Sequence, residues 1–115
     1  MRVTLTTTGR TSGEPRQATL YAWPDGSDDR LVIVASQGGK PDDPAWAFNL
    51  RAHPACVITA GKRRIDLRAT EVPEGDERER LWALVTGAFP MYRSYQKKTE
   101  RRIPLFVLEP DPQAG

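Results

Sequence analysis

The stretch from Val34 to Asn49 constrains the fold of this chain more than any other segment. It continues from an apolar, β-branched run, Leu31-Val-Ile-Val34, that is typical of a buried strand. Gly38-Gly39 then allows backbone angles that are closed to other residues. Asp43 suits the N-cap of a helix, and Pro44 suits the first helical position, where its missing N–H is not needed. A strand, a glycine turn and the positive end of a helix form an arrangement that can hold a phosphorylated ligand.

Turn residues and hydrophobic periodicity divide the rest of the chain into short strands and a few helices. The expected strands are residues 2–8, 16–23, 30–36, 55–60, 63–72 and 103–108. The expected helices cover residues 44–52, a segment that starts within 73–76 and stops before Phe89-Pro90, and residues 91–99. About six strands in meander order, with two or three helices, predict an α+β fold that is mainly β: a small barrel flanked by helices.

Length and composition narrow the classes of protein that remain. The 115 residues fit a single domain, expected over 1–110, with a short tail at 111–115 that should fray. A net charge of +2 is too small to argue for a nucleic-acid partner. No apolar run approaches the ~20 residues of a membrane span. Cys56 is the single cysteine, which excludes an intrachain disulfide and fits a cytoplasmic location; with one histidine, it predicts no metal site.

The first turn carries a cluster of cationic and hydroxyl side chains. Arg10, Thr11 and Ser12 precede Gly13, and Arg16 enters the next strand. Two planar guanidinium groups can bind phosphate oxygens in pairs, so the cluster suits an anion. A solvated hairpin tip with ordinary surface arginines is the alternative. An anion site would be favoured if this turn met the Gly38-Gly39 turn at one end of the barrel.

Aromatic residues form a second candidate group, comprising Tyr21, Trp46, Phe48, Tyr92 and Tyr95. Planar ligands stack on such rings, and tyrosine hydroxyls can orient a carbonyl or nitro group. Helical spacing makes core packing the preferred interpretation of Trp46, Phe48 and Trp82. The two tyrosines of the last expected helix follow a proline among charged residues, and we expect them to face a pocket.

The other candidate residues have structural explanations that require no catalytic role. His53 ends the 44–52 helix, where capping accounts for it, and Cys56 reads as an inert core thiol. The charged runs 74–80 and 97–102 are expected to be solvated faces, although the second could border an anionic site. Because hydrolytic machinery is missing while phosphate- and ring-binding features are present, the sequence indicates a cofactor that brings its own chemistry.

Four motifs resemble the deazaflavin-dependent nitroreductase family, which includes F420H2-dependent quinone reductases. They are Leu5-Thr-Thr-Thr-Gly-Arg-Thr-Ser-Gly-Glu-Pro-Arg16, Val34-Ala-Ser-Gln-Gly-Gly39, Pro44-Ala-Trp-Ala-Phe-Asn-Leu-Arg-Ala-His-Pro54, and Tyr95-Gln96 with Arg102-Ile-Pro104. The resemblance implies a split β-barrel that uses coenzyme F420, a deazaflavin with a phosphodiester and an oligoglutamate tail. It further implies hydride transfer from the reduced cofactor to a quinone, a nitroaromatic compound or a similar small acceptor.

The resemblance also assigns residues to the site. Those assigned to the cofactor are Arg10, Thr11, Ser12, Arg16, Gln17, Ala18, Thr19, Leu20, Tyr21, Val34, Ala35, Ser36, Gln37, Ala45, Trp46, Ala47, Phe48, Asn49 and Tyr92. The candidates for polarising the acceptor are Tyr21, Ser36, Tyr92 and Tyr95. Family members often carry a cationic residue at the positions of Gln37 and Thr11. Lys40 could compensate for the cationic contact that is missing at Gln37. Phe89 stands where a third pocket tyrosine can occur.

Several alternatives stay open at the level of the sequence. The same barrel could use FMN, as in pyridoxamine-phosphate-oxidase-like relatives, or it could bind the deazaflavin without turnover. Many family members carry an additional N-terminal helical segment before the first strand. Contact with the membrane periphery and the identity of the acceptor are therefore open, as is the choice between a monomer and a homodimer.

Overall fold

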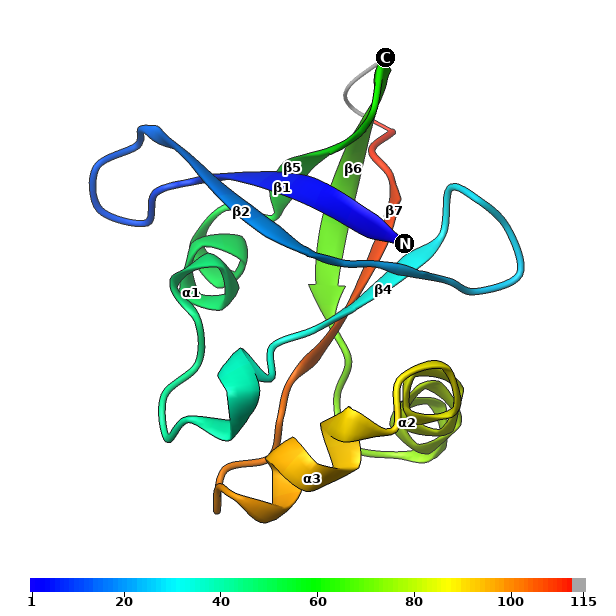
Figure 1. The fold of residues 1–115 in the computed structure, drawn as a ribbon. Helices are drawn as coiled ribbons and strands as arrows, with labels where there is room; N and C mark the ends of the chain where they lie inside the picture. Colours follow the sequence, from blue (N-terminus) through cyan, green and yellow to red (C-terminus); the bar gives the residue numbers. More distant parts are fainter. Residues whose placement is uncertain (113–115) are drawn as a thin grey trace.

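A computed structural model describes residues 1–112 as one antiparallel sheet with helices packed against it (Figure 1). The strands are β1 (Arg2–Thr8), β2 (Pro15–Tyr21), β3 (Trp23–Pro24), β4 (Leu31–Val34), β5 (Ala55–Ala60), β6 (Arg63–Glu71) and β7 (Leu105–Pro110). The helices are the 3-10 turn η1 (Gln37–Gly39), α1 (Ala45–Ala52), α2 (Asp76–Ala88) and α3 (Met91–Lys97). The expected α+β, mainly β architecture is confirmed.

The sheet is curled into a half-barrel. Its strand order is β2-β1-β5-β6-β7-β4-β3, so the two edge strands are consecutive in the chain and only Ala22 separates them. Ala22 is fully buried, and its backbone exchanges two 2.8 Å hydrogen bonds with Met1. The expected strand over 16–23 is therefore one bent segment whose two halves border opposite edges of the sheet.

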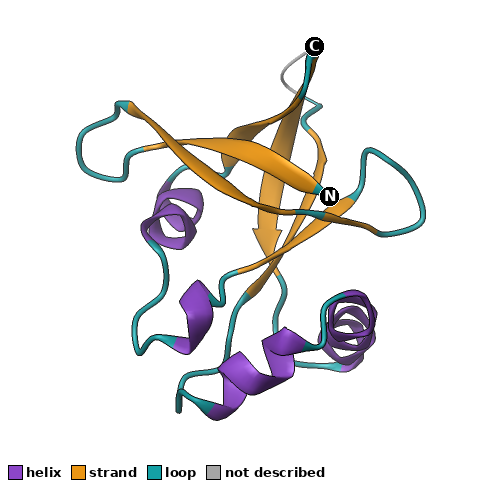
Figure 2. Cartoon of the chain, in the orientation of Figure 1, coloured by secondary structure: helices purple, strands orange, loops and turns teal. Residues whose placement is uncertain are grey.

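The core has two parts because β4 is buried on both faces. Leu31 and Ile33 join the cluster under α1, whereas Val32 and Val34 join the cluster under α2 and α3. Side chains alternate between the faces of a strand, so an unbroken apolar run is what a doubly covered strand requires. In the view of Figure 2, the helices gather below the sheet, and the β1–β2 turn and the 25–30 turn project on opposite sides.

Most boundaries follow the sequence, and the start of α1 is the instructive exception. β1 and β5 have the expected limits, and β7 begins two residues later than expected. The expected N-cap is wrong: Pro44 occupies the N-cap position of α1, and no side chain caps the helix. The Asp43 carboxylate instead pairs with Arg51 and Arg101, at 2.9 Å each. Within the expected tail 111–115, residues 113–115 lie outside the described part of the chain.

Candidate functional site

The β1–β2 turn holds its shape through its own backbone and hydroxyl groups. The Gly9 N–H donates to the Glu14 carbonyl at 2.8 Å, which closes the turn. Ser12 Oγ accepts from the Glu14 N–H at 3.1 Å and from Arg16 Nη2 at 3.2 Å. The Arg16 side chain is thus folded back over the turn, beside the hydroxyl with which the sequence grouped it.

A buried amide joins this turn to α1. Asn49 Oδ1 accepts from the Arg10 N–H at 3.0 Å, and Asn49 Nδ2 donates to Thr7 Oγ1 at 3.1 Å. Both side chains are buried, at 6% exposure for Asn49 and 3% for Thr7. The Arg10 guanidinium lies 4.5 Å from the centre of the Phe48 ring, a cation–π contact. Asn49 therefore serves to orient the arginine turn against the helix.

A cavity of about 440 Å³ opens between the turn, β2 and the start of α1. It is lined by Thr7, Gly9, Arg10, Thr11, Ser12, Arg16, Gln17, Ala18, Ala45, Trp46 and Asn49. All of these except Thr7 and Gly9 are among the cofactor residues predicted from the sequence. The arginine turn thus meets the start of α1 rather than the Gly38-Gly39 turn.

The two arginines of the cavity are chemically available. Among residues 1–112, no carboxylate lies within ion-pair distance of Arg10 or Arg16, although eleven ion pairs form elsewhere. Each retains guanidinium N–H groups for an anion. The arrangement can hold a phosphate or carboxylate group at the mouth of a mainly apolar cavity.

The segment that follows β4 forms a separate wall. Val34 and Ala35 are buried, Ser36 and Gln37 are half-buried, and Gly39 packs against the Tyr95 carbonyl of α3. Gln37 has a left-handed backbone, with φ of 44°, and its side-chain amide donates to the Asp42 carbonyl at 2.8 Å. The Ser36 hydroxyl forms no hydrogen bond within residues 1–112, which leaves it free for a ligand.

The predicted aromatic group divides into two. Tyr21, Tyr92 and Tyr95 lie together, joined by Trp23 and Phe89. Trp46 packs edge-on against Phe106 in the first core cluster, 5.7 Å between ring centres, and Phe48 lies under Arg10. The preference for packing roles at Trp46 and Phe48 is thus consistent with the contacts, although Trp46 also lines the cavity.

Trp23 is the site candidate that sequence reasoning missed. Its ring stacks on Tyr21 at 5.7 Å, and its Nε1–H donates to the Tyr92 hydroxyl at 3.0 Å. Tyr92 is only 6% exposed, and this burial raises its pKa despite the Trp23 hydrogen bond. The spacing of two residues between Tyr21 and Trp23 is the signal that could have found it, because alternate strand residues share a face.

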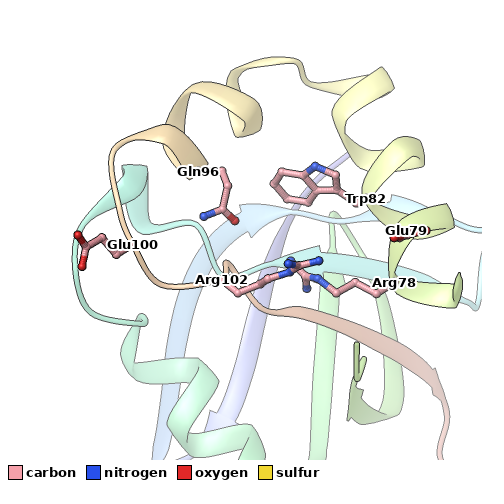
Figure 3. Close-up of a pocket in the computed structure, with 6 residues that line it drawn as sticks. All are labelled: Arg78, Glu79, Trp82, Gln96, Glu100 and Arg102. Atoms are coloured by element: carbon pink, nitrogen blue, oxygen red, sulfur yellow. The ribbon is translucent and has the colours of Figure 1, made fainter. Parts of the chain in front are cut away.

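Two charged residues that were expected to be solvated are structural. Arg78 is 5% exposed, and its Nη2 donates to the Ile103 carbonyl at 2.7 Å. It lines a second cavity, of about 420 Å³, in which its guanidinium lies next to that of Arg102 (Figure 3). Burial and this neighbouring charge lower the pKa of Arg78. Arg101 is the other case: its side chain is 15% exposed, and it donates four hydrogen bonds to three backbone carbonyls and Asp43. No residue that the sequence assigned to the site lines the second cavity.

The remaining candidates offer no reactive group. His53 is exposed at the end of α1, where its N–H donates to the Asn49 carbonyl at 2.7 Å. Burial raises the pKa of Cys56 to about 12, so its thiol is un-ionised and unreactive at neutral pH. Within the described residues, no group of three or more histidine, cysteine or acidic side chains could hold a metal ion.

The curled antiparallel sheet, with one helix beside its first hairpin and two at the opposite side, makes this chain a split-barrel protein. A putative pyridoxamine 5'-phosphate oxidase from Listeria innocua shares the fold, with a TM-score of 0.64 at 13% identity over 96% of this chain and 83% of the other.

The particular family follows from closer matches. The model of the F420H(2)-dependent quinone reductase family matches residues 2–110, and the chain belongs to this family. An F420H(2)-dependent quinone reductase of Mycobacterium tuberculosis is 40% identical over 106 residues, covering 90% of this chain and 70% of the relative. The chain is therefore an F420H2-dependent oxidoreductase, and coenzyme F420 is its cofactor.

Two solved structures that are 40% identical to this chain share its fold. An F420-H2 dependent reductase, FDR-A, has a TM-score of 0.82 at 40% identity, over 94% of this chain and 93% of the other. A protein described as a domain-swapped dimer has a TM-score of 0.83 at 40% identity, over 94% of this chain and 79% of the other. Among the described residues, no helix is long and apolar enough to span a membrane.

Proposed function

We propose that this protein transfers a hydride from reduced coenzyme F420 to a small quinone, and that nitroaromatic compounds also serve as acceptors. The family name supports the cofactor, and the name of the mycobacterial relative supports the quinone. The observation that carries the site is the cavity beside the β1–β2 turn, because nine of the residues predicted to bind the cofactor line it.

The residues of the cavity fit the anionic part of the cofactor. Arg10 and Arg16 lack a carboxylate partner among residues 1–112, and Ser12 adds a hydroxyl beside them. Such groups suit a phosphodiester and the carboxylates of an oligoglutamate tail. We assign these three residues to the charged part, and Val34–Gln37 with Ala45–Asn49 to the ring.

The remaining chemistry concerns protons and water. When it is bound, reduced F420 supplies the hydride. The aromatic cluster of Tyr21, Trp23, Phe89, Tyr92 and Tyr95 would cover the reacting face and exclude water. The Tyr92 phenol is protonated at neutral pH, as a tyrosine ordinarily is, and burial raises its pKa further. Because Trp23 donates to the Tyr92 oxygen, the phenol proton stays free to be donated to an acceptor oxygen. The Tyr95 and Ser36 hydroxyls are further candidates for this role.

Binding and turnover experiments test the proposal in sequence. Oxidised F420 and FMN are titrated separately into the purified protein, and menadione and a nitrofuran are then supplied with reduced F420. We expect tighter binding of F420 and oxidation of the reduced cofactor by both acceptors. Tighter binding of FMN would overturn the cofactor assignment in this chain, and turnover with menadione alone would remove the nitroaromatic acceptor.

Charge removal tests the anion site itself. Arg10→Ala and Arg16→Ala should each weaken F420 binding by about 1–3 kcal/mol, the scale of one charge-assisted contact. Arg63→Ala is the matched control, because Arg63 is an exposed arginine on β6 outside the cavity. Unchanged affinity in both cavity variants would refute the assignment.

A further inference from the structure

The guanidinium of Arg101 donates hydrogen bonds to three backbone carbonyls of one loop. Its Nε donates to the Lys40 carbonyl at 2.9 Å, Nη1 to the Ala35 carbonyl at 3.0 Å, and Nη2 to the Ser36 carbonyl at 2.9 Å. These acceptors lie more than 60 residues away in the sequence. A single side chain thus holds both ends of the loop that connects β4 to α1.

This loop cannot hold its conformation by local interactions alone. Gln37, Gly38 and Gly39 have consecutive φ values of 44°, 64° and 82°, and the left-handed region is unfavourable for a residue with a side chain. The local hydrogen bonds are few. The Gly39 N–H donates to the Ser36 carbonyl at 2.8 Å, the Lys40 N–H donates to the Gln37 carbonyl at 3.2 Å, and the Gln37 side-chain amide donates to the Asp42 carbonyl. A conformation of this kind persists only when surrounding groups fix it.

Arg101 is itself fixed by α3. Gln96 Nε2 donates to the Arg101 carbonyl at 2.8 Å, while Gln96 Oε1 accepts from the Ile103 N–H at 3.0 Å. The last turn of α3 also packs on the loop, because a Cβ on Gly39 would lie 2.7 Å from the Tyr95 carbonyl. The loop and the helix that carries Tyr95 therefore form one connected unit.

The charge of Arg101 is already neutralised by an ion pair within the protein, which excludes a role in binding the phosphate group of the cofactor. Nη1 pairs with Asp43 Oδ1 at 2.9 Å, and each of the two side chains is 15% exposed. Asp43 also pairs with Arg51 of α1, which in turn pairs with Glu71 of β6 at 2.7 Å. Unlike Arg10 and Arg16, Arg101 is thus committed to the protein and not available to bind a phosphate group.

We propose that Arg101 is a positioning residue for the cofactor: it shapes the wall formed by Val34–Gln37 and couples that wall to α3. The proposal rests on the proposed function, which assigns these residues to the deazaflavin ring. A guanidinium group spreads five donors over three nitrogens and here reaches four acceptors, whereas an ammonium group has only three donors on one atom. Only arginine satisfies the loop fully at this position.

The test compares Arg101→Gln and Arg101→Lys with Arg102→Gln. Arg102 is the matched control, since its side chain is 59% exposed and pairs only with Glu74 within the described residues. Equilibrium titration with oxidised F420 gives the affinity, and hydrogen exchange of the cofactor-free protein reports on residues 34–43. We expect Arg101→Gln to weaken binding about 10-fold or more and Arg101→Lys about 3-fold or more. Both should speed exchange in that loop, whereas Arg102→Gln stays within about twofold of the wild type.

Kinetics with menadione separates positioning from general loss of stability. We expect saturating cofactor to order the loop in the variant, so that KM for reduced F420 rises while kcat stays within about threefold. Wild-type affinity in Arg101→Gln would overturn the positioning role while leaving the proposed function intact. If Arg101→Gln does not fold, Arg101→Lys decides, and wild-type affinity there overturns the role. Failure of the wild type itself to bind F420 would instead refute the proposed function.

Discussion

Replacing Asn49 by leucine should destabilise the protein by about 2–3 kcal/mol, because the buried amide makes two hydrogen bonds that leucine cannot make. The variant loses the 3.0 Å bond from the Arg10 N–H and the 3.1 Å bond to Thr7 Oγ1. Each bond contributes about 1 kcal/mol, and the Thr7 hydroxyl, at 3% exposure, is left without a partner. For a chain of 115 residues, 1 kcal/mol corresponds to about 4 °C in Tm, so Tm should fall by about 8–12 °C.

A double-mutant cycle with Thr7→Val identifies the cause. Thr7→Val leaves the Asn49 amide only partly paired, but the double variant Asn49→Leu/Thr7→Val leaves no hydroxyl unsatisfied. The double variant should therefore be about 1 kcal/mol more stable than the sum of the single changes predicts, by urea unfolding. Additive losses would refute the assigned hydrogen bond.

Ligand binding separates the two bonds of Asn49. Asn49→Leu releases the arginine turn and removes an amide that lines the cavity, so it should weaken F420 binding about 3- to 10-fold. Thr7→Val keeps the bond to the Arg10 N–H and should bind F420 as the wild type does. Equal effects of the two variants on affinity would show that Asn49 does not act by orienting the turn.

Three further predictions address other groups. The Arg80 guanidinium holds the pKa of Asp25 at about 2, below its value of 3.8 in the unfolded chain, so the resulting stability is present above pH 4 and is lost as the pH falls toward 2. Between pH 7 and pH 3, Asp25→Asn should therefore lose about 1 kcal/mol less stability than the wild type in urea unfolding, and equal losses would contradict this. The Cys56 thiol, with its pKa raised to about 12 by burial, should react with iodoacetamide only on unfolding, and labelling of the folded protein at the rate of free cysteine would contradict its burial. Tyr92→Phe should lower turnover more than it lowers F420 affinity, because it removes the phenol proton and leaves the ring against Trp23; a larger loss of affinity would remove its acceptor-side role.

Strand and helix positions were accessible from the sequence because their signals are local. The alternation of side chains in β1 and β5 and the unbroken apolar run of β4 reflect which faces are buried. The arginine turn was recognisable for the same reason, since its two arginines and two hydroxyl groups lie within the seven residues 10–16. The resemblance to a family rested on such local motifs, and the match over residues 2–110 confirms it.

Helix capping at Asp43 shows where a local rule fails. The residue type and its place before a proline favour an N-cap, worth about 1 kcal/mol. Two arginines, from α1 and from the loop before β7, offer the same carboxylate charge-assisted bonds instead. Whether the Asp43 carboxylate caps the helix or pairs with arginine is decided by Arg51 and Arg101, which lie 8 and 58 residues away in the sequence. A local sequence pattern carries no information about such distant partners.

The sequence by itself determined the elements of this protein, the cationic turn and the family to which it belongs. Only the tertiary structure decided that Trp23 joins the tyrosines, that Asn49 orients the arginine turn, and that Arg101 holds the loop after β4. The physical reason is that a side chain's role depends on which polar groups the fold brings within about 3 Å of it. Arg101 and Arg102 are neighbours of the same type, yet one is buried among carbonyls and the other is exposed to solvent.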